Sequence, residues 1–195
     1  MSRPEPAPPA EASSIVTRPL WLVTIAYVLY WLQLLGHEAG HALGRILFTG
    51  DADLTRRWPL RVQIATFGGG PLFTFALMGV AVAVAMRARS ARVRMIAVIV
   101  GLTAASRSVS IVPKSVAGMP TDERALSQFL GVPYLLIGGI ELVLTVVVVR
   151  ALVVAIPPNT RRRTLTWIVL AIIVAFITAM TFGKALGIPV GNIWG

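Results

Sequence analysis

The stretch PLWLVTIAYVLYWLQLLGHEAGHALGRILF, residues 19–48, decides the fold of this chain. It is a long and almost continuous apolar run, so it predicts a helix that crosses a membrane. A helix of this length extends about 45 Å, which exceeds the roughly 30 Å hydrocarbon core of a bilayer. We therefore expect the helix to tilt or to protrude from the bilayer.

A polar motif, His37-Glu38-Ala39-Gly40-His41, interrupts this run near its C-terminal end. Histidines four residues apart lie one turn apart on the same helix face, so both imidazoles can bind a single metal ion. In this spacing the residue Glu38 is the usual general base, which takes a proton from a metal-activated water. His37 and His41 are the only two histidines of the chain, and polar groups inside a membrane are usually functional. The less favoured alternative is that the two histidines only hydrogen-bond to their neighbours.

The composition places the chain among membrane proteins. It is 56% hydrophobic and 13% charged, with a mean hydropathy of +0.78, whereas a soluble protein carries about twice this charged fraction. The net charge is +10, but Lys and Arg cluster between apolar runs and no nucleic-acid motif accompanies them, which argues against nucleic-acid binding. Because the chain has no cysteine, any metal site must use histidine and carboxylate ligands.

The apolar runs predict an all-α integral membrane protein with about five transmembrane helices. Residues 1–18 form a Pro-rich tail that we expect to be disordered, and residues 19–195 form one membrane-embedded domain. The bilayer is therefore the first partner that the sequence predicts. The five expected spans cover residues 19–48, 72–86, 95–112, 134–156 and 165–186.

The connection between the first two spans has an unusual sequence. LRVQIATF, residues 60–67, is rich in β-branched residues and predicts a short extended or re-entrant segment. Gly68-Gly69-Gly70-Pro71 follows and should break that segment before the second helix. The glycines either let the backbone approach the first helix closely or form a flexible turn. We expect water and substrate to enter here.

Several charged residues fall in or near the later spans. Thr121 can cap a short helix that starts with Asp122 and Glu123, and the helix dipole alone would favour both carboxylates there. The functional alternative is that one of the two is a third metal ligand. Arg107 either snorkels to the interface, which we favour, or pairs with a carboxylate such as Asp122. Glu141 is an intramembrane carboxylate and therefore a functional candidate.

The distribution of basic residues favours one orientation. More of them fall on the N-terminal side of the bilayer than on the other, which predicts that the N-terminus is cytoplasmic. We expect a multi-pass protein of a prokaryotic cell membrane, and the sequence does not predict its oligomeric state. The basic residues on the N-terminal side are Arg3, Arg18, Arg87, Arg89, Arg92, Arg94 and the triplet at 161–163.

Three segments resemble the site-2 protease family, intramembrane zinc metalloproteases that cut transmembrane substrates. HEAGHALG, residues 37–44, looks like the catalytic helix of that family. Gly70-Pro71-Leu72-Phe73-Thr74 looks like its Gly-Pro-Leu-x-Asn segment. Val112-Pro113 followed by Pro120-Thr121-Asp122 looks like its Leu-Pro … Asp-Gly segment. The resemblance covers about residues 21–130.

The resemblance implies that His37, His41 and Asp122 bind a zinc ion (Zn2+), with Glu38 as catalytic base. Two histidines and one carboxylate leave an open fourth position, as in catalytic zinc sites. Other carboxylates remain open as the third ligand, in the order Glu123, Glu141 and Asp51.

Two positions depart from the pattern of the family. Thr74 stands where the family usually has Asn, a group thought to hold the scissile backbone or its oxyanion, and Glu123 stands where Gly is usual. The resemblance implies that Gly70 and Thr74 contact the substrate or its oxyanion, although a hydroxyl does not reproduce an amide.

The favoured function is therefore an intramembrane zinc endopeptidase that acts on transmembrane protein substrates. A second hypothesis is a non-proteolytic metal-binding membrane protein that binds a partner. A third is a carrier that uses Glu141 and Lys184 as intramembrane charges, although the chain has no internal repeat.

Overall fold

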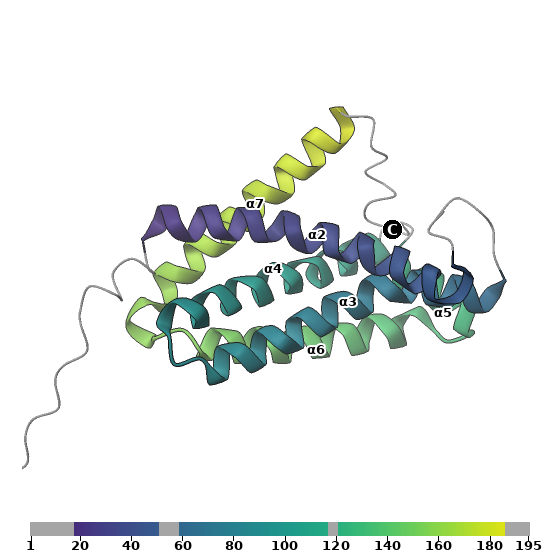
Figure 1. Ribbon diagram of the computed structural model, residues 1–195, viewed down its shortest axis with the longest axis horizontal. Helices are drawn as coiled ribbons and strands as arrows, with labels where there is room; N and C mark the ends of the chain where they lie inside the picture. The colour runs from purple at the N-terminus through teal and green to yellow at the C-terminus, as the bar shows by residue number, and fades with distance from the viewer. Residues whose placement is uncertain (1–17, 51–58, 117–120, 186–195) are drawn as a thin grey trace, which may run out of the picture.

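The computed structural model describes residues 18–50, 59–116 and 121–185, and it is helical throughout these ranges apart from short connections (Figure 1). The expected all-α fold is thus confirmed for the described residues. α2, α3, α4 and α6 lie side by side, and α5 lies at the end of the bundle where α2 ends and α3 begins. The helices are α2 (Pro19–Thr49), α3 (Leu60–Arg87), α4 (Ala91–Val116), α5 (Asp122–Leu130), α6 (Tyr134–Val154) and α7 (Pro158–Ala185).

Four of these helices are long and apolar enough to cross a membrane. They are α2, α3 from Val62, α6, and α7 as far as Phe182. The chain is therefore consistent with a multi-pass membrane protein. A fifth span is not shown, because α4 does not meet the same measure over its described residues. The N-terminal tail at residues 1–17 lies outside the described residues.

α3 corrects the expected extended segment. Residues 60–67 are the first turns of a continuous helix that runs on through the glycines, with Pro71 inside it. The extended segment and the break after it are therefore wrong, and a re-entrant segment is not shown. Proline in a helix interior removes one backbone donor, which makes a break the ordinary expectation.

Close packing against α2 explains the glycines of α3. A Cβ on Gly40 of α2 would lie 2.6 Å from the carbonyl oxygen of Gly69, and a Cβ on Gly69 would overlap the carbonyl of Gly40. The interpretation that the glycines permit a close backbone approach is confirmed. Gly36, Gly40 and Gly44 recur every fourth residue on the matching face of α2, a spacing that lets membrane helices approach closely.

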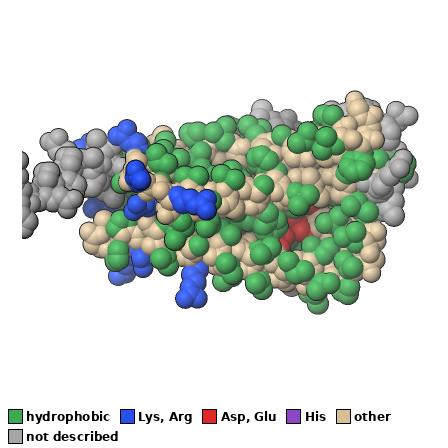
Figure 2. All heavy atoms as spheres, turned by 60° about the horizontal axis from the view of Figure 1, so that its bottom comes forward, with side chains coloured by type: hydrophobic (Ala, Val, Ile, Leu, Met, Phe, Trp, Pro, Cys, Tyr) green, Lys and Arg blue, Asp and Glu red, His purple; other side chains and the backbone are tan. Residues whose placement is uncertain are grey.

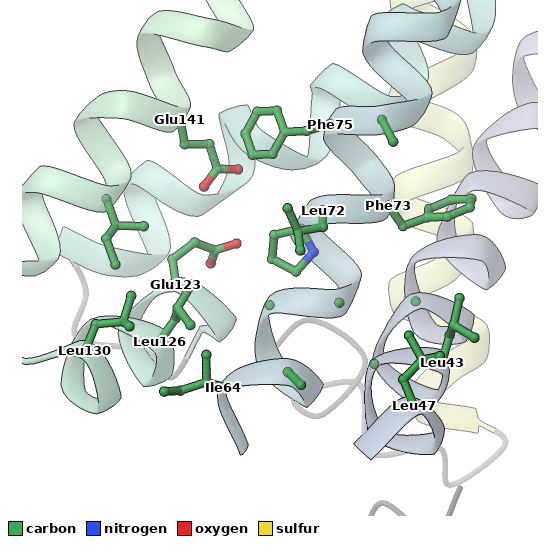
Figure 3. A pocket seen from close by; sticks show the side chains of 18 of the residues that line it. Leu43, Leu47, Ile64, Leu72, Phe73, Phe75, Glu123, Leu126, Leu130 and Glu141 are labelled. Atoms are coloured by element: carbon green, nitrogen blue, oxygen red, sulfur yellow. The ribbon is translucent and has the colours of Figure 1, made fainter. Parts of the chain in front are cut away.

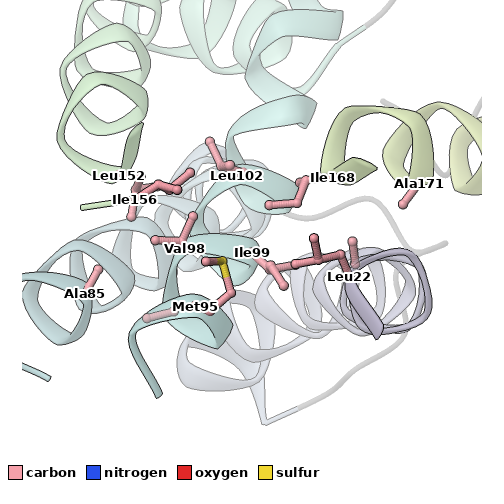
Figure 4. Packing of buried hydrophobic residues seen from close by; sticks show 12 residues of the cluster. Leu22, Ala85, Met95, Val98, Ile99, Leu102, Leu152, Ile156, Ile168 and Ala171 are labelled. Atoms are coloured by element: carbon pink, nitrogen blue, oxygen red, sulfur yellow. The ribbon is translucent and has the colours of Figure 1, made fainter. Parts of the chain in front are cut away.

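The main apolar core lies toward the other end of the bundle. Leu22 of α2, Ile99 of α4, Leu152 of α6 and Ile168 of α7 are all fully buried, and they converge in Figure 4. With Ala85 of α3, this cluster joins five helices, and it fixes α2 beside α4. The His37–His41 motif lies farther along α2, so packing outside the motif holds this helix in place.

Arginine side chains gather at one end of the molecule, as Figure 2 shows. Exposed arginines there come from the α3–α4 connection, such as Arg89, and from the first turns of α7, such as Arg162. α7 begins at Pro158 and not at residue 165, so the arginine triplet is helical and not a loop. The remaining face in Figure 2 is mainly hydrophobic, with an acidic patch set in a hollow.

Candidate metal centre

Three ligand atoms converge between α2 and α5. The Nε2 atoms of His37 and His41 lie 3.0 Å apart, and Oδ2 of Asp122 lies 3.2 Å from each of them. All three residues are buried. Ligands at about 2.0–2.1 Å from a tetrahedral zinc are about 3.3 Å from one another. The triangle therefore has the size of three ligands around one ion, and the group could hold a metal ion.

The outer nitrogen of each imidazole has its own partner. His41 Nδ1 lies 2.7 Å from the carbonyl oxygen of Thr66, which can only accept, so this nitrogen carries the proton. His37 Nδ1 lies 2.9 Å from the hydroxyl oxygen of Thr74, and that hydroxyl donates to the carbonyl of Gly70 over 3.2 Å. The Thr74 oxygen therefore accepts from His37 Nδ1–H. In both neutral rings Nε2 is left with a free lone pair.

These assignments bring three acceptor atoms together at one point. Two Nε2 lone pairs of neutral rings would face each other and the ionised Oδ2 of Asp122. Such a cluster is stable only with a positive charge among its members, either a metal ion or protons on the rings. The donor set and its geometry therefore fit a metal ion, whose identity the structure does not show.

Gly70 leaves the space in front of the two histidines open. A Cβ at this position would overlap the Nε2 atoms of both His37 and His41. The glycine of α3 thus packs directly on the atoms that would bind the ion. A role of Gly70 in binding substrate stays a prediction.

α5 places Asp122 opposite the histidines. Thr121 caps the helix as expected, because its hydroxyl accepts from the backbone N–H of Arg124 over 3.2 Å. Gly131 ends the helix in the left-handed region, at φ 66°. α5 is therefore a short, defined helix that brings Asp122 to the site from its first residue.

Arg107 of α4 anchors the start of α5. Its Nη2 donates to Oδ2 of Asp122 over 2.6 Å, and its Nη1 donates to Oε1 of Glu123 over 3.3 Å. Its side chain is 4% exposed. The expectation that Arg107 snorkels to the interface is therefore wrong, and the alternative of pairing with Asp122 is confirmed. A guanidinium can serve two carboxylates because its nitrogens form a planar fork.

Asp122, on the short helix α5, is held in its ionised form. Burial by itself raises the pKa of this carboxyl. When protons on the rings supply the positive charge, hydrogen bonds from His37 and His41, together with the charge of Arg107, outweigh burial and hold the pKa of Asp122 well below its usual range. The carboxylate is therefore ready to act as a ligand at neutral pH, since metal ligands must be deprotonated.

Glu38 lies on α2 between the two histidines and is partly buried. Its carboxylate makes no hydrogen bond or salt bridge with the described residues. It lies within electrostatic range of His41, Asp122 and Arg107. An uncommitted carboxylate beside the metal ligands is available to a water or to a substrate group, and its role as base stays a prediction.

The other carboxylates that sequence allowed as third ligand are placed elsewhere. Glu123 pairs with Arg107, and Glu141 of α6 is not part of the cluster of ligand atoms. Asp51 lies outside the described residues, as does the side chain of Lys184. Among the described residues Asp122 is the carboxylate that joins the histidines.

Two supporting residues were missed by sequence reasoning. The carbonyl of Thr66, which orients His41, has no sequence signal, because every residue carries a carbonyl. The role of Thr74 in orienting His37 was missed because the resemblance suggested a substrate contact at that position. The sequence signal is a threonine four residues after Gly70, one helical turn along α3, where the structure buries its hydroxyl.

An apolar cavity of about 820 Å³ adjoins the metal centre (Figure 3). Residues of α2, α3, α5 and α6 line it. Gly40 precedes His41, Gly69 and Pro71 flank Gly70, and Glu123 follows Asp122. The cavity wall thus includes residues next in sequence to His41, Gly70 and Asp122.

No protein-family model matches this chain, and neither does any curated protein or any solved structure. The resemblance to the site-2 protease family therefore rests on the three short segments alone, and the geometry of the site is the independent support for a function.

Proposed function

We propose that this protein is an intramembrane zinc metalloendopeptidase that hydrolyses peptide bonds in or near the transmembrane segments of other membrane proteins. The observation that carries the proposal is the convergence of His37, His41 and Asp122 at 3.0–3.2 Å between ligand atoms. Two histidines, one carboxylate and an open fourth position are the donor set of catalytic zinc. When bound there, zinc supplies polarisation of the scissile carbonyl and a lowered pKa of the attacking water.

Glu38 is the general base in this proposal. Its carboxylate takes one proton from the attacking water as the new C–O bond forms at the scissile carbon. The same proton then passes to the leaving nitrogen as the C–N bond breaks, so the two products are a carboxylic acid and an amine. A carboxylate without other partners suits both transfers, because no existing hydrogen bond has to be broken.

Three further residues orient the ligands. Thr74 and the carbonyl of Thr66 fix the rings of His37 and His41, and Arg107 fixes the carboxylate of Asp122. Such outer partners keep ligands in place and raise metal affinity. Thr74 is a positioning residue here, because its hydroxyl is already engaged with His37 and with the carbonyl of Gly70.

The proposal includes a membrane arrangement. We place α4 as a fifth span, since α2, α3 and α6 pack around it and its Thr103, Arg107 and Ser108 are buried. The arginine-rich end faces the cytoplasm, together with the N-terminus of α2, in the cell membrane of a prokaryote. The candidate centre then lies toward the opposite leaflet.

Replacement of Glu38 tests the proposal. Glu38→Gln keeps the size of the side chain but cannot accept a proton, so cleavage of a transmembrane substrate in proteoliposomes should fall about a hundredfold or more. Zinc content should stay at the wild-type value. Arg150→Gln puts the same amide on an exposed position of α6 and should cleave like wild type. Undiminished cleavage by Glu38→Gln contradicts the proposal.

One observation favours a second candidate function. The Thr74 hydroxyl is engaged with His37, so it does not replace the amide that the resembled family has there. The alternative is a non-proteolytic metal-binding membrane protein that binds a partner. In that case a cellular phenotype of the deletion would be rescued by Glu38→Gln and not by His37→Ala. The peptidase proposal expects both variants to fail.

A further inference from the structure

Two carboxyl groups face the apolar cavity beside the metal centre. Glu123 of α5 and Glu141 of α6 both line it, and Figure 3 shows both carboxylates pointing into it. Glu123 is 1% exposed and Glu141 is 6% exposed. Most of the remaining wall is apolar, including Leu72, Phe75 and Leu126. Buried carboxylates in such surroundings are costly unless a donor or a cation satisfies them.

Arg107 forms the salt bridges with the carboxylates at this end of the cavity. Arg107 binds Oδ2 of Asp122 and Oε1 of Glu123. Oε2 of Glu123 is buried and has no hydrogen-bond partner. Glu141 makes no salt bridge with a described residue, and its polar neighbour is the neutral hydroxyl of Ser108. One guanidinium thus serves two carboxylates, while the third carboxyl group and a free oxygen of the second face the cavity.

A lipid chain would complement this cavity poorly. Acyl chains can cover the apolar wall but offer no donor, so Oε2 of Glu123 would stay without a partner and Glu141 without a cation. A lysine or arginine side chain complements both parts of the surface. Its methylene stem packs on the apolar residues while its charged group reaches the carboxylates.

We infer that this cavity binds a Lys or Arg side chain carried on an otherwise apolar transmembrane segment, with Glu141 and Glu123 as the recognition pair. The inference rests on the proposed function, because the bound segment is then the substrate. Gly40 and Gly69 line the cavity, and Gly70, which packs on the Nε2 atoms of both histidines, follows Gly69. A basic residue in the cavity therefore brings a nearby peptide bond to the metal centre, and substrate choice depends on it.

A pair of synthetic transmembrane peptides tests the inference. Both have the same Leu/Ala sequence, and one carries a single central Lys where the other carries Met, which is neutral and of similar length. Binding to the Glu38→Gln protein in lipid nanodiscs is followed by energy transfer from a labelled peptide, so no cleavage intervenes. The Lys peptide should bind about tenfold more tightly than the Met peptide, as one charged hydrogen bond provides.

Variants of cavity residues test whether Glu141 causes the preference for the Lys peptide. Glu141→Gln, made in the same background, should reduce it to within about twofold, because the neutral amide no longer attracts a cation. Ile140→Val trims the same cavity without changing its charge and should keep the preference. If Glu141→Gln does not fold, as judged by its thermal unfolding, the Lys–Met comparison on the parent protein still decides.

The outcomes separate this inference from the proposed function. Equal binding of the two peptides, no saturable binding of either, or a preference that persists in Glu141→Gln overturns the recognition pair. Selective binding of the Lys peptide by a wild-type protein that cuts neither peptide supports the recognition pair and contradicts the peptidase. Cleavage of both peptides at equal rates supports the peptidase and overturns the recognition pair.

Discussion

The imidazole Nδ1 of His37 on α2 donates to the hydroxyl of Thr74 on α3 across 2.9 Å. This hydrogen bond, like the one from His41 to the carbonyl of Thr66, joins α2 to the helix packed against it. It also orients the ring so that His37 Nε2 faces His41 and Asp122, and it selects the tautomer in which Nε2 carries no proton. The ligand geometry of the candidate centre therefore depends on a residue that is not itself a ligand.

Removal of the Thr74 hydroxyl should weaken metal binding. Thr74→Val leaves His37 Nδ1 without its acceptor, so zinc affinity should fall about tenfold to a hundredfold, whereas Thr74→Ser should stay near wild type. Competition with a chelating dye measures both affinities. Thr145→Val removes a buried hydroxyl from α6, away from the histidines, and serves as the control. Unchanged affinity in Thr74→Val would contradict the positioning role.

A methyl group at Gly70 should block the centre. The Cβ of Gly70→Ala would overlap the Nε2 atoms of both histidines, so this variant should purify without zinc. Gly68→Ala is the matched control, since a Cβ at Gly68 has nothing within 4 Å. Alanine also favours the helix by up to about 1 kcal/mol over glycine, so Gly68→Ala should be at least as stable as wild type. Elemental analysis that finds equal zinc in the two variants would refute this account of Gly70.

The features that sequence predicted well are local. The spacing of His37 and His41 places two ligands on one helix face without knowledge of the fold, and the cap at Thr121 follows from the short segment around it. The extended segment at 60–67 was predicted wrongly because β-branched residues, glycines and Pro71 disfavour a helix in isolation. Contact with α2 decides the conformation instead, and tertiary contacts of this kind cannot be deduced from one segment.

Contacts between residues that are far apart in the chain could not be predicted from the sequence and are seen only in the structure. Arg107 and Asp122 are 15 residues apart in the chain and meet only in the fold, where α5 packs against α3 and α6. Asp122 itself was chosen from a resemblance, since spacing alone left Glu123, Glu141 and Asp51 open. Glu141 was a functional candidate by its depth in an apolar run, but its place in the cavity beside Glu123 follows from the packing of α5 and α6.

Loss of Arg107 should destabilise the fold strongly. Arg107→Met leaves two buried carboxylates without their cation, and breaking a buried pair in this way costs about 3–5 kcal/mol. Arg107→Lys should recover only part of this loss, because an ammonium cannot replace two separate guanidinium nitrogens on two carboxylates. Thermal unfolding in detergent gives the order wild type, Arg107→Lys, Arg107→Met. A Met variant as stable as wild type would contradict the ion-pair account.

Acid should remove the contribution of Asp122 to stability. The folded-state pKa of Asp122 is lower than the unfolded value of about 3.9, so its ionised form stabilises the folded state above that pH. The contribution is lost as the pH falls below about 4 toward the folded-state pKa. Metal-free wild type should therefore unfold at a higher temperature than Asp122→Asn near pH 6. The difference should shrink toward pH 3, and a difference that grows instead would contradict the direction of the shift.

The most direct test of the central claim is the zinc content of the purified protein. Wild type, Glu38→Gln, His37→Ala and Asp122→Ala are isolated in detergent, supplied with zinc, freed of excess metal and measured by elemental mass spectrometry. The account predicts about one zinc per chain in wild type and Glu38→Gln, and loss of zinc in the two ligand variants. A well-folded wild type without zinc would contradict it, and the converging histidines would then be held together by protons alone.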